Sequence, residues 1–199
     1  MRRMFLKSLF AAMALSVLAP SLYTAPAQAA QATAIFAGGC FWCMEPPFDK
    51  TGGVISTTSG YIGGSVANPT YKQVSAGGTG HIEAVKVVYD PNRVSYDRLL
   101  DIFWRNVDPF DGGGQFCDRG SQYKSAIFYT DTAQKTAATA SKAAVQKRFG
   151  KAVATSIRRA GTFYPAEDYH QNYYKKNSLK YKFYRSRCGR DSRLSAVWG

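Results

Sequence analysis

The sequence contains few of the residues from which metal sites are built. It has two histidines, His81 and His170, and four cysteines, of which only Cys40 and Cys43 are closely spaced. A structural zinc site usually combines two such close pairs of cysteine or histidine ligands. One pair without a second argues against zinc, and we expect neither a metal nor another cofactor.

Acidic residues are scarce, and the basic residues occur without a nucleic-acid-binding motif. Lysine and arginine number 26 against 13 aspartate and glutamate residues, which gives a net charge of +13. Such an excess is typical of proteins that bind polyanions, so a non-enzymatic protein that binds a polyanion or cell wall is one alternative. The basic residues are scattered, however, and no RNA-binding or helix-turn-helix signature is present. We therefore interpret them as solvated surface and expect no nucleic-acid partner.

The apolar run at residues 8–18 is too short to cross a membrane, for which about 20 residues are needed. It follows the basic residues Arg2, Arg3 and Lys7 and precedes Ala27-Gln28-Ala29, a small-x-small cleavage pattern. We expect residues 1–29 to be a cleavable export signal, with Arg2-Arg3 compatible with the twin-arginine route. The mature chain would be periplasmic or secreted, without stable membrane insertion.

Internal repeats and linkers are also absent, so residues 30–199 are expected to form one domain. Alternating or apolar stretches predict strands at 33–37, 54–61, 82–89, 123–129 and 155–158. Helices are predicted at 41–50, 95–106 and 131–149, with another beginning near Pro165. This interleaving indicates an α/β or α+β fold, with a mixed sheet of at least four strands covered by helices. From Leu179 we expect an irregular C-terminal tail.

The stretch from Gly38 to Cys43 is the strongest candidate for a reactive site. A buried strand leads into two glycines, which permit a tight turn, and Cys40 follows at the start of a helix. Backbone N–H groups and the helix dipole favour negative charge there, so we expect a lowered thiol pKa and a nucleophilic thiolate. The aromatic neighbours Phe41 and Trp42 suit a small apolar group. The alternative is that Cys40 is an inert buried thiol.

The four cysteines leave their pairing open. An even number in an oxidising compartment is compatible with disulfides, and four cysteines allow three pairings that sequence does not separate. The Cys40-x-x-Cys43 spacing also suggests a thioredoxin-like or disulfide-isomerase protein. Against this, Trp42 lies inside the pair, and no later loop obviously supplies the facing cis-proline of such proteins.

Several motifs occur in one order along the chain and together resemble the A-type peptide methionine sulfoxide reductases. They are Gly39-Cys40-Phe41-Trp42, Gly60-Tyr61-Ile62-Gly63-Gly64, Asn68-Pro69-Thr70-Tyr71, Gly80-His81-Ile82-Glu83-Ala84-Val85, Asp118-Arg119-Gly120-Ser121-Gln122-Tyr123-Lys124-Ser125 and Tyr164-Pro165-Ala166-Glu167-Asp168-Tyr169-His170-Gln171. The resemblance implies a two-layer, ferredoxin-like α/β sandwich. It also implies reduction of methionine S-sulfoxide, free or in oxidised exported proteins, to methionine.

The resemblance also implies roles for individual residues. Cys40 matches the nucleophile that attacks the sulfoxide sulfur, and Glu83 matches the acid that protonates the sulfoxide oxygen. Strand alternation alone would have turned Glu83 outward. Tyr71 and Tyr123 match hydroxyls that bind that oxygen.

Further residues match the substrate pocket. Phe41 and Trp42 match its apolar wall for the S-methyl group, and Asp118 matches a polar site residue, where the alternative is a turn-capping aspartate.

After the first step, Cys40 would carry a sulfenic acid that a second thiol resolves to a disulfide. Cys188 resembles the family's C-terminal recycling cysteine. Cys43 stands where the commoner pattern has glycine, and it could resolve the sulfenic acid or merely pack. Cys117 is interpreted as a bystander or local structural thiol. The implied partners are methionine sulfoxide proteins or peptides and a thioredoxin-like or other dithiol reductant, and we expect a monomer.

Overall fold

The computed structural model describes residues 30–199, so the predicted export signal at 1–29 lies outside the described residues. Within the described part, no helix is both long and apolar enough to cross a membrane. Six strands form the main sheet: β1 (Ala32–Ala37), β2 (Val54–Ile62), β3 (Ile82–Tyr89), β6 (Ala126–Tyr129), β7 (Ser156–Arg159) and β8 (Phe163–Pro165). Two further strands, β4 (Gly114–Gln115) and β5 (Asp118–Arg119), make a separate short hairpin.

The main sheet has the strand order β7-β6-β1-β3-β2-β8. Only β6 and β7 are parallel, and all other neighbours are antiparallel, so the sheet is mixed. Helix α1 (Phe41–Asp49) connects β1 to β2, and α3 (Tyr96–Trp104) lies between β3 and β6. The four middle strands and these two helices therefore have the βαββαβ order of a ferredoxin-like fold, which confirms the predicted fold class.

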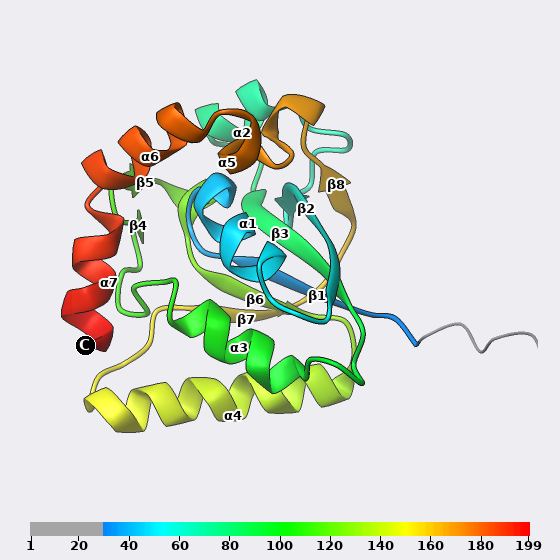
Figure 1. The fold of residues 1–199 in the computed structure, drawn as a ribbon, viewed down its shortest axis with the longest axis vertical. Helices are drawn as coiled ribbons and strands as arrows, with labels where there is room; N and C mark the ends of the chain where they lie inside the picture. Colours follow the sequence, from blue (N-terminus) through cyan, green and yellow to red (C-terminus); the bar gives the residue numbers. More distant parts are fainter. Residues whose placement is uncertain (1–29) are drawn as a thin grey trace, which may run out of the picture.

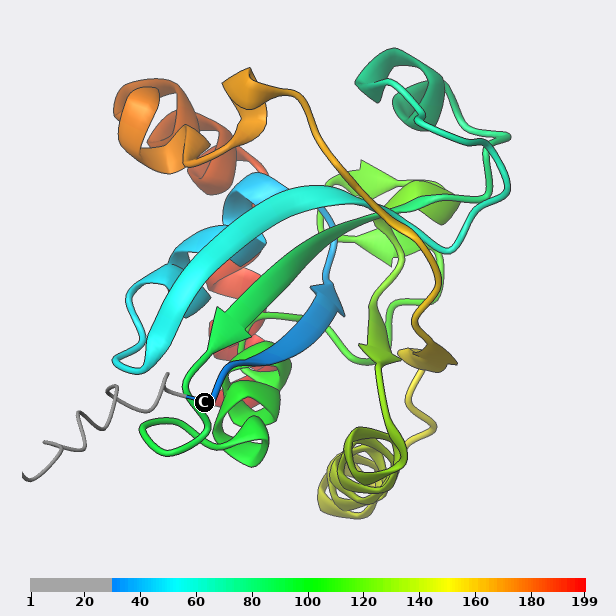
Figure 2. The same cartoon turned by 90° about the vertical axis from the view of Figure 1, so that its right-hand side faces the viewer.

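The helices α1, α3 and α4 (Thr132–Phe149) cover one face of the sheet and enclose the main core (Figures 1 and 2). Helix α4 also makes the crossover that the parallel pair β6 and β7 requires. Alternation in β1 sends Phe36 into this core and Ile35 into a smaller cluster on the opposite face. In β3, Val85 and Val87 point to the helices. Glu83 shares their parity, so it also points to the helix face.

The prediction of a helix that begins near Pro165 is wrong. Phe163–Pro165 is instead the edge strand β8, which pairs with β2 and places Tyr164 opposite Tyr61. A proline is tolerated on an edge strand because one side of that strand makes no ladder hydrogen bonds. The 3₁₀ turns η1 (Ser121–Tyr123) and η2 (Asp168–His170) and the short helix α2 (Tyr71–Ala76) lie in the connections.

The prediction of an irregular C-terminal tail is also wrong. The chain continues as helices α5 (Tyr173–Lys176), α6 (Ser178–Arg187) and α7 (Arg190–Trp198), which run along one side of the domain (Figure 1). Helix α7 buries Arg190, Leu194 and Trp198. These residues are four positions apart, so they lie on one face of a helix, and packing of that face orders a segment whose composition is otherwise basic and polar.

Candidate active site

Cys40 is the N-cap residue of α1, directly after a tight turn at the end of β1. Two glycines make the turn possible: Gly39 has a φ of +81°, and a Cβ at Gly38 would lie 2.5 Å from the sulfur of Met44. The predicted helix N-terminus is therefore present. The side chain of Cys40 is only 6% exposed, so the thiol is largely shielded from solvent.

Glu83 lies beneath the N-terminus of α1. Its carboxylate oxygen Oε2 accepts a hydrogen bond of 3.1 Å from the backbone N–H of Phe41, and the residue is 1% exposed. Burial raises the pKa of Glu83 to about 8, although the Phe41 N–H opposes this shift. At neutral pH this carboxyl group is therefore mostly protonated and can act as an acid.

Cys43 lies one helical turn after Cys40, and the two thiols share a hydrogen bond. That bond lowers the pKa of Cys43 to about 7, with further help from Arg190 and Arg185. The expected lowering of the Cys40 pKa is wrong for this state. Burial, the bond to Cys43 and the charge of Glu83 raise the pKa of Cys40 well above its usual range. The surroundings therefore favour negative charge on Cys43 over Cys40.

Arg190 supplies a buried positive charge beside the two thiols. It is 1% exposed, and its Nη2 donates hydrogen bonds to the carbonyl oxygens of Gly38 (3.0 Å) and Asn106 (2.7 Å). The guanidinium carbon also lies 4.3 Å from the centre of the Phe116 ring. Arg190 thus fixes the glycine turn before Cys40 and at the same time stabilises negative charge on Cys43.

Tyr71 and Tyr123 come from α2 and η1, on connections that reach over the sheet. Burial and the neighbouring charges of Glu83 and Cys40 raise the pKa of Tyr71 to about 12. The pKa of Tyr123 is raised by burial, and Glu83, Tyr71, Asp118 and Cys40 all add to it. Both hydroxyls are thus within electrostatic reach of Cys40 and Glu83, and both remain protonated hydrogen-bond donors at neutral pH.

The two aromatic residues after Cys40 have different surroundings. Phe41 is 1% exposed and packs against Tyr61 and His170, so it belongs to the core. Trp42 is half-buried, stacks on Tyr173 with ring centres 3.7 Å apart, and donates its Nε1–H to Nδ1 of His170 at 2.9 Å. Trp42 is therefore the better placed of the two to contact a substrate.

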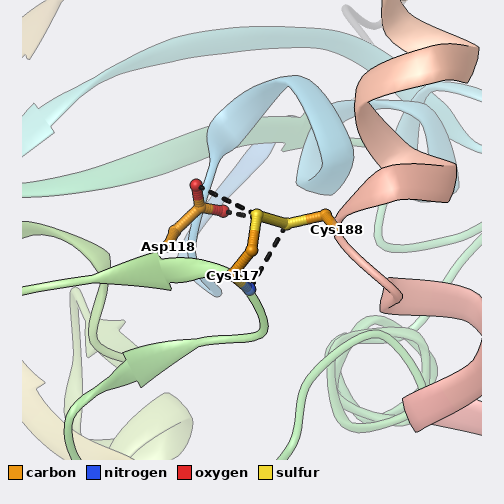
Figure 3. A group of neighbouring side chains, drawn as sticks. All are labelled: Cys117, Asp118 and Cys188. Carbon is orange, nitrogen blue, oxygen red and sulfur yellow. Dashed lines mark hydrogen bonds between the residues drawn. A yellow bond between two sulfur atoms is a disulfide. The ribbon is translucent and has the colours of Figure 1, made fainter.

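Asp118 connects Cys40 with the other two cysteines. Its carboxylate accepts hydrogen bonds from the Cys40 backbone N–H and from the Tyr184 hydroxyl, whose oxygen lies 2.6 Å from both carboxylate oxygens. Cys117 and Cys188 form a disulfide with Cα atoms 4.9 Å apart, and each sulfur lies 3.9 Å from Asp118 (Figure 3). The interpretation of Cys117 as a bystander or local thiol is therefore wrong, because it is the partner of Cys188.

The sulfur atoms of Cys117 and Cys188 and a carboxylate oxygen of Asp118 lie within 4.8 Å of one another, a spacing that is compatible with metal ligands. The two sulfurs are bonded to each other, so neither is a thiolate ligand in this state. A surface cavity of about 880 Å³ between α3 and α4 is lined by residues such as Leu100 and Ala137 and contains none of the site residues. The candidate active site is therefore identified by the chemistry of its side chains and not by the size of a cavity.

The sequence profile described as "Peptide methionine sulfoxide reductase" matches residues 32–199, which is nearly all of the described chain. The chain belongs to this family. A relative from Caulobacter vibrioides named peptide methionine sulfoxide reductase MsrA 2 is 51% identical over 202 residues, with 100% of both chains covered. The protein is thus an oxidoreductase of the peptide methionine sulfoxide reductase family.

Solved structures of this family have the same fold. Reduced Mxr1 from Saccharomyces cerevisiae has a TM-score of 0.71 and 31% identity, covering 79% of this chain and 91% of the yeast chain. Mxr1 in complex with Trx2 matches at a TM-score of 0.52 and 23% identity, covering 77% of this chain and 90% of that chain.

Sequence reasoning missed three side chains of this reductase site: Cys117 as a disulfide partner, Tyr184 and Arg190. His170 is buried and accepts a hydrogen bond from Trp42, and burial lowers its pKa to about 4. Tyr184 and Arg190 reach the site from the C-terminal helices. The spacing of Arg190, Leu194 and Trp198, four residues apart, could have predicted that α7 is a helix with one buried face.

Proposed function

We propose that this chain reduces methionine S-sulfoxide, free or within proteins, to methionine, with Cys40 as the nucleophile. The observation that carries the proposal is the meeting of a reduced Cys40 and a buried Glu83 at the N-terminus of α1. A sulfoxide sulfur is attacked only when its oxygen gains a proton, and Glu83, with a pKa of about 8, holds that proton at neutral pH. The preference for the S-epimer is the part that the family resemblance contributes.

In the first step, the Cys40 sulfur attacks the sulfoxide sulfur while Glu83 protonates the sulfoxide oxygen. The Tyr71 and Tyr123 hydroxyls donate hydrogen bonds to that oxygen, and Trp42 contacts the S-methyl group. Cys43 accepts the proton of Cys40 through the hydrogen bond between the two sulfurs. Methionine leaves reduced by two electrons, and Cys40 retains the oxygen as a sulfenic acid.

In the second step, Cys43 resolves the sulfenic acid. Its sulfur lies next to that of Cys40. The proton that Cys43 accepted in the first step passes to Glu83, which lost one there, and the resulting thiolate, stabilised by the positive charges of Arg190 and Arg185, attacks the Cys40 sulfur. The sulfenic oxygen takes that proton and leaves as water, and a Cys40–Cys43 disulfide forms. An external dithiol then supplies the two electrons that restore these thiols, by way of Cys188, which the family resemblance gives as the recycling cysteine. A thioredoxin-like protein is the proposed donor because Mxr1 was crystallised with Trx2.

The disulfide-isomerase alternative is disfavoured by the burial of both thiols. Cys43 is 1% exposed and Cys40 is 6% exposed, so a disulfide of a folded protein substrate does not reach them. Thiol exchange requires the attacking sulfur to approach along the disulfide axis. A methionine sulfoxide side chain is slender enough to enter where a protein disulfide is not.

Single-turnover reduction of a methionine S-sulfoxide peptide tests the proposal. The enzyme is fully reduced, freed of reductant and mixed with the peptide, and methionine is measured by chromatography. Wild type is expected to form methionine, whereas Cys40→Ser forms none and the R-epimer is not reduced. Cys43→Ser is expected to make methionine and then stop at a sulfenic acid, which a dimedone-type reagent traps. Methionine formation by Cys40→Ser would refute the proposal.

We also propose that residues 1–29 direct export and that the mature protein, a monomer, repairs exported proteins. The basic start, apolar run and Ala27-Gln28-Ala29 pattern support export. Fusing residues 1–29 to a reporter and fractionating the cells is the test, with a matched fusion carrying Arg2→Lys and Arg3→Lys to separate the twin-arginine route from the general one. A reporter retained in the cytoplasm would contradict export, and light scattering of the mature chain tests the monomer.

A further inference from the structure

The carboxylate of Glu167 joins two parts of the site that are about a hundred residues from it in the sequence. Its Oε1 accepts a hydrogen bond of 2.8 Å from the backbone N–H of Tyr71, and its Oε2 accepts one of 2.9 Å from the hydroxyl of Tyr61. Tyr71 is the first residue of α2, whereas Tyr61 is a fully buried residue of β2. One carboxylate therefore connects a helix of the β2–β3 connection to the sheet.

The sheet end of this connection is next to Glu83. Tyr61 and Glu83 are direct partners across the antiparallel strands β2 and β3. Glu167 is held against the same part of β2, because the neighbouring Ala166 donates its backbone N–H to the carbonyl oxygen of Ser59 at 2.9 Å. The backbone that carries Glu167 thus has a fixed position relative to Glu83.

The other end of the connection holds the helix that carries Tyr71. Helix α2 has only six residues, and a helix of this length is not stable by itself, so its position depends on the groups that it contacts. The capping box between Thr70 and Gln73 lies within the helix and its cap. The bond from Tyr71 to Glu167, by contrast, ties the start of the helix to the sheet.

The segment that contains Glu167 also contacts the ring of Tyr71. His170, three residues further along in η2, packs against this ring with ring centres 4.4 Å apart. The backbone N–H and the ring of Tyr71 are therefore both held by one short segment. The Tyr71 hydroxyl is within electrostatic reach of Glu83, the group that protonates the sulfoxide oxygen in the proposed function.

Glu167 is ionised at neutral pH. Partial burial opposes the charge, but the hydrogen bonds from the Tyr71 N–H and the Tyr61 hydroxyl hold the pKa of Glu167 below its usual range. A hydrogen bond to a charged acceptor is stronger than one to a neutral acceptor. Both bonds of this carboxylate are of the stronger kind, which suits a contact that fixes a short helix in place.

We propose that Glu167 is a positioning residue that holds the Tyr71 hydroxyl at its working distance from the Glu83 carboxyl group. The proposal rests on the proposed function, in which both groups act on the sulfoxide oxygen. Glu167 acts through Tyr71 and not on the substrate itself. Without an acceptor at this position, the start of α2 moves away from the sheet. A donor stabilises the charge that develops on an oxygen only at hydrogen-bond distance, so the movement slows the chemical step.

Single-turnover reduction of a methionine S-sulfoxide peptide tests this role. Glu167→Ala is expected to lower the rate at saturating peptide by about tenfold or more, because a donor of the sulfoxide oxygen is misplaced. The peptide concentration that gives half of the maximal rate is expected to change by less than about threefold, since the lost contact acts mainly in the transition state. Methionine formed per chain is expected to equal that of wild type, which distinguishes a slower reaction from a smaller folded fraction.

Two further variants test whether the acceptor at this position is what matters. Glu167→Gln keeps an oxygen that accepts the Tyr71 N–H, so its rate is expected to stay within about threefold of wild type. Gln73→Ala is the matched control, because it removes an exposed part of the capping box at the same end of α2, and its rate is expected to change by less than about twofold. A Glu167→Gln rate as low as that of Glu167→Ala, or equal losses in Gln73→Ala and Glu167→Ala, would overturn the proposal.

A double-mutant cycle with Tyr71→Phe shows whether Glu167 acts through Tyr71. The Tyr71→Phe variant lacks the hydroxyl, so adding Glu167→Ala to it is expected to lower the rate by no more than about twofold. Losses that multiply in the double variant would overturn the positioning role and leave Cys40 as the nucleophile of the proposed function, and so would a wild-type rate in either single variant. Failure of wild type to form any methionine would instead refute the proposed function.

Discussion

Glu83 shows how one buried side chain sets the chemistry of this site. Burial removes its carboxyl group from water and raises its pKa to about 8 against the opposing effect of the Phe41 N–H, so the proton is present at neutral pH and lost above it. Folding holds this proton more tightly than the unfolded chain does, so the carboxyl's contribution to stability declines as pH rises from its usual pKa through about 8. The same burial that makes an acid also limits the alkaline range of the protein.

The Glu83→Gln variant is expected to lose about 10²- to 10⁴-fold in the rate of methionine formation, because an amide does not donate a proton to the sulfoxide oxygen. For wild type, the rate is expected to rise with pH through about 7, as Cys43 deprotonates, and to fall through about 8, as Glu83 does. The pH profile of single-turnover rates checks this. If the Glu83→Gln variant still loses rate above about pH 8, the descending limb belongs to another group.

The buried charge of Arg190 is predicted to control the pKa of Cys43. The Arg190→Met variant removes the buried charge, so the pKa of Cys43 is expected to rise and the ascending limb of the pH profile to move to higher pH. The ultraviolet absorbance of the thiolate, titrated with Cys40 and Cys43 as the only free thiols, measures the shift directly. A variant that is merely damaged would be slow at every pH, whereas this one is expected to recover as the pH rises.

At the scale of elements, the C-terminal helices are held by a few buried contacts. Trp198 is 8% exposed, and its Nε1 donates to the Val107 carbonyl at 3.0 Å while Phe149 packs against its ring. Trp198→Ala is expected to reduce the free energy of unfolding by about 3–5 kcal/mol. The matched control is Phe183→Ala on α6, whose side chain is 69% exposed, with an expected change within about 0.5 kcal/mol. Urea denaturation measures both, and equal losses would mean that α7 is not anchored by its buried face.

The elements whose pattern is local could be predicted, and those defined by distant partners could not. The helix α4 was expected at 131–149 and is found at Thr132–Phe149, because Asp131 caps it and Gly150 ends it. The strand β8 has three residues and owes its form to pairing with β2, which no local pattern shows. The tail was misjudged for the same reason, because its helices are ordered by the groups that they contact.

The candidate site divides in the same way. Cys40, Glu83 and the tyrosines lie in motifs that can be recognised, and the turn before Cys40 was predicted from its glycines. Their protonation was not predictable from motifs, since the Cys40 pKa depends on Glu83 and Cys43 and on burial. The pairing of Cys117 with Cys188 was left open because several pairings were possible, and only the approach of α6 to the β4–β5 hairpin selects one (Figure 1).

For the molecule as a whole, a buried neutral histidine makes stability depend on pH on the acid side. Burial lowers the pKa of His170 to about 4, below its usual 6.5, so the unfolded chain takes up this proton first as the pH falls. Stability is therefore expected to decline between about 6.5 and 4, by up to about 3 kcal/mol from this residue. His170→Gln keeps an acceptor for Trp42 and does not titrate. The difference in unfolding free energy between wild type and this variant should vary over that pH interval, and a constant difference would contradict the argument.

The position of α7 has a consequence for how the protein is made. Arg190 and Cys188 come near the end of the sequence, yet they complete a site whose nucleophile lies near the start of the domain. A copy whose synthesis stops early contains Cys40 and Glu83, but it lacks both the cation beside the thiols and the disulfide that faces solvent. The site is thus incomplete until α7 has been made and has docked. Fragments that lack α7 are expected to reduce methionine sulfoxide more slowly than the complete domain.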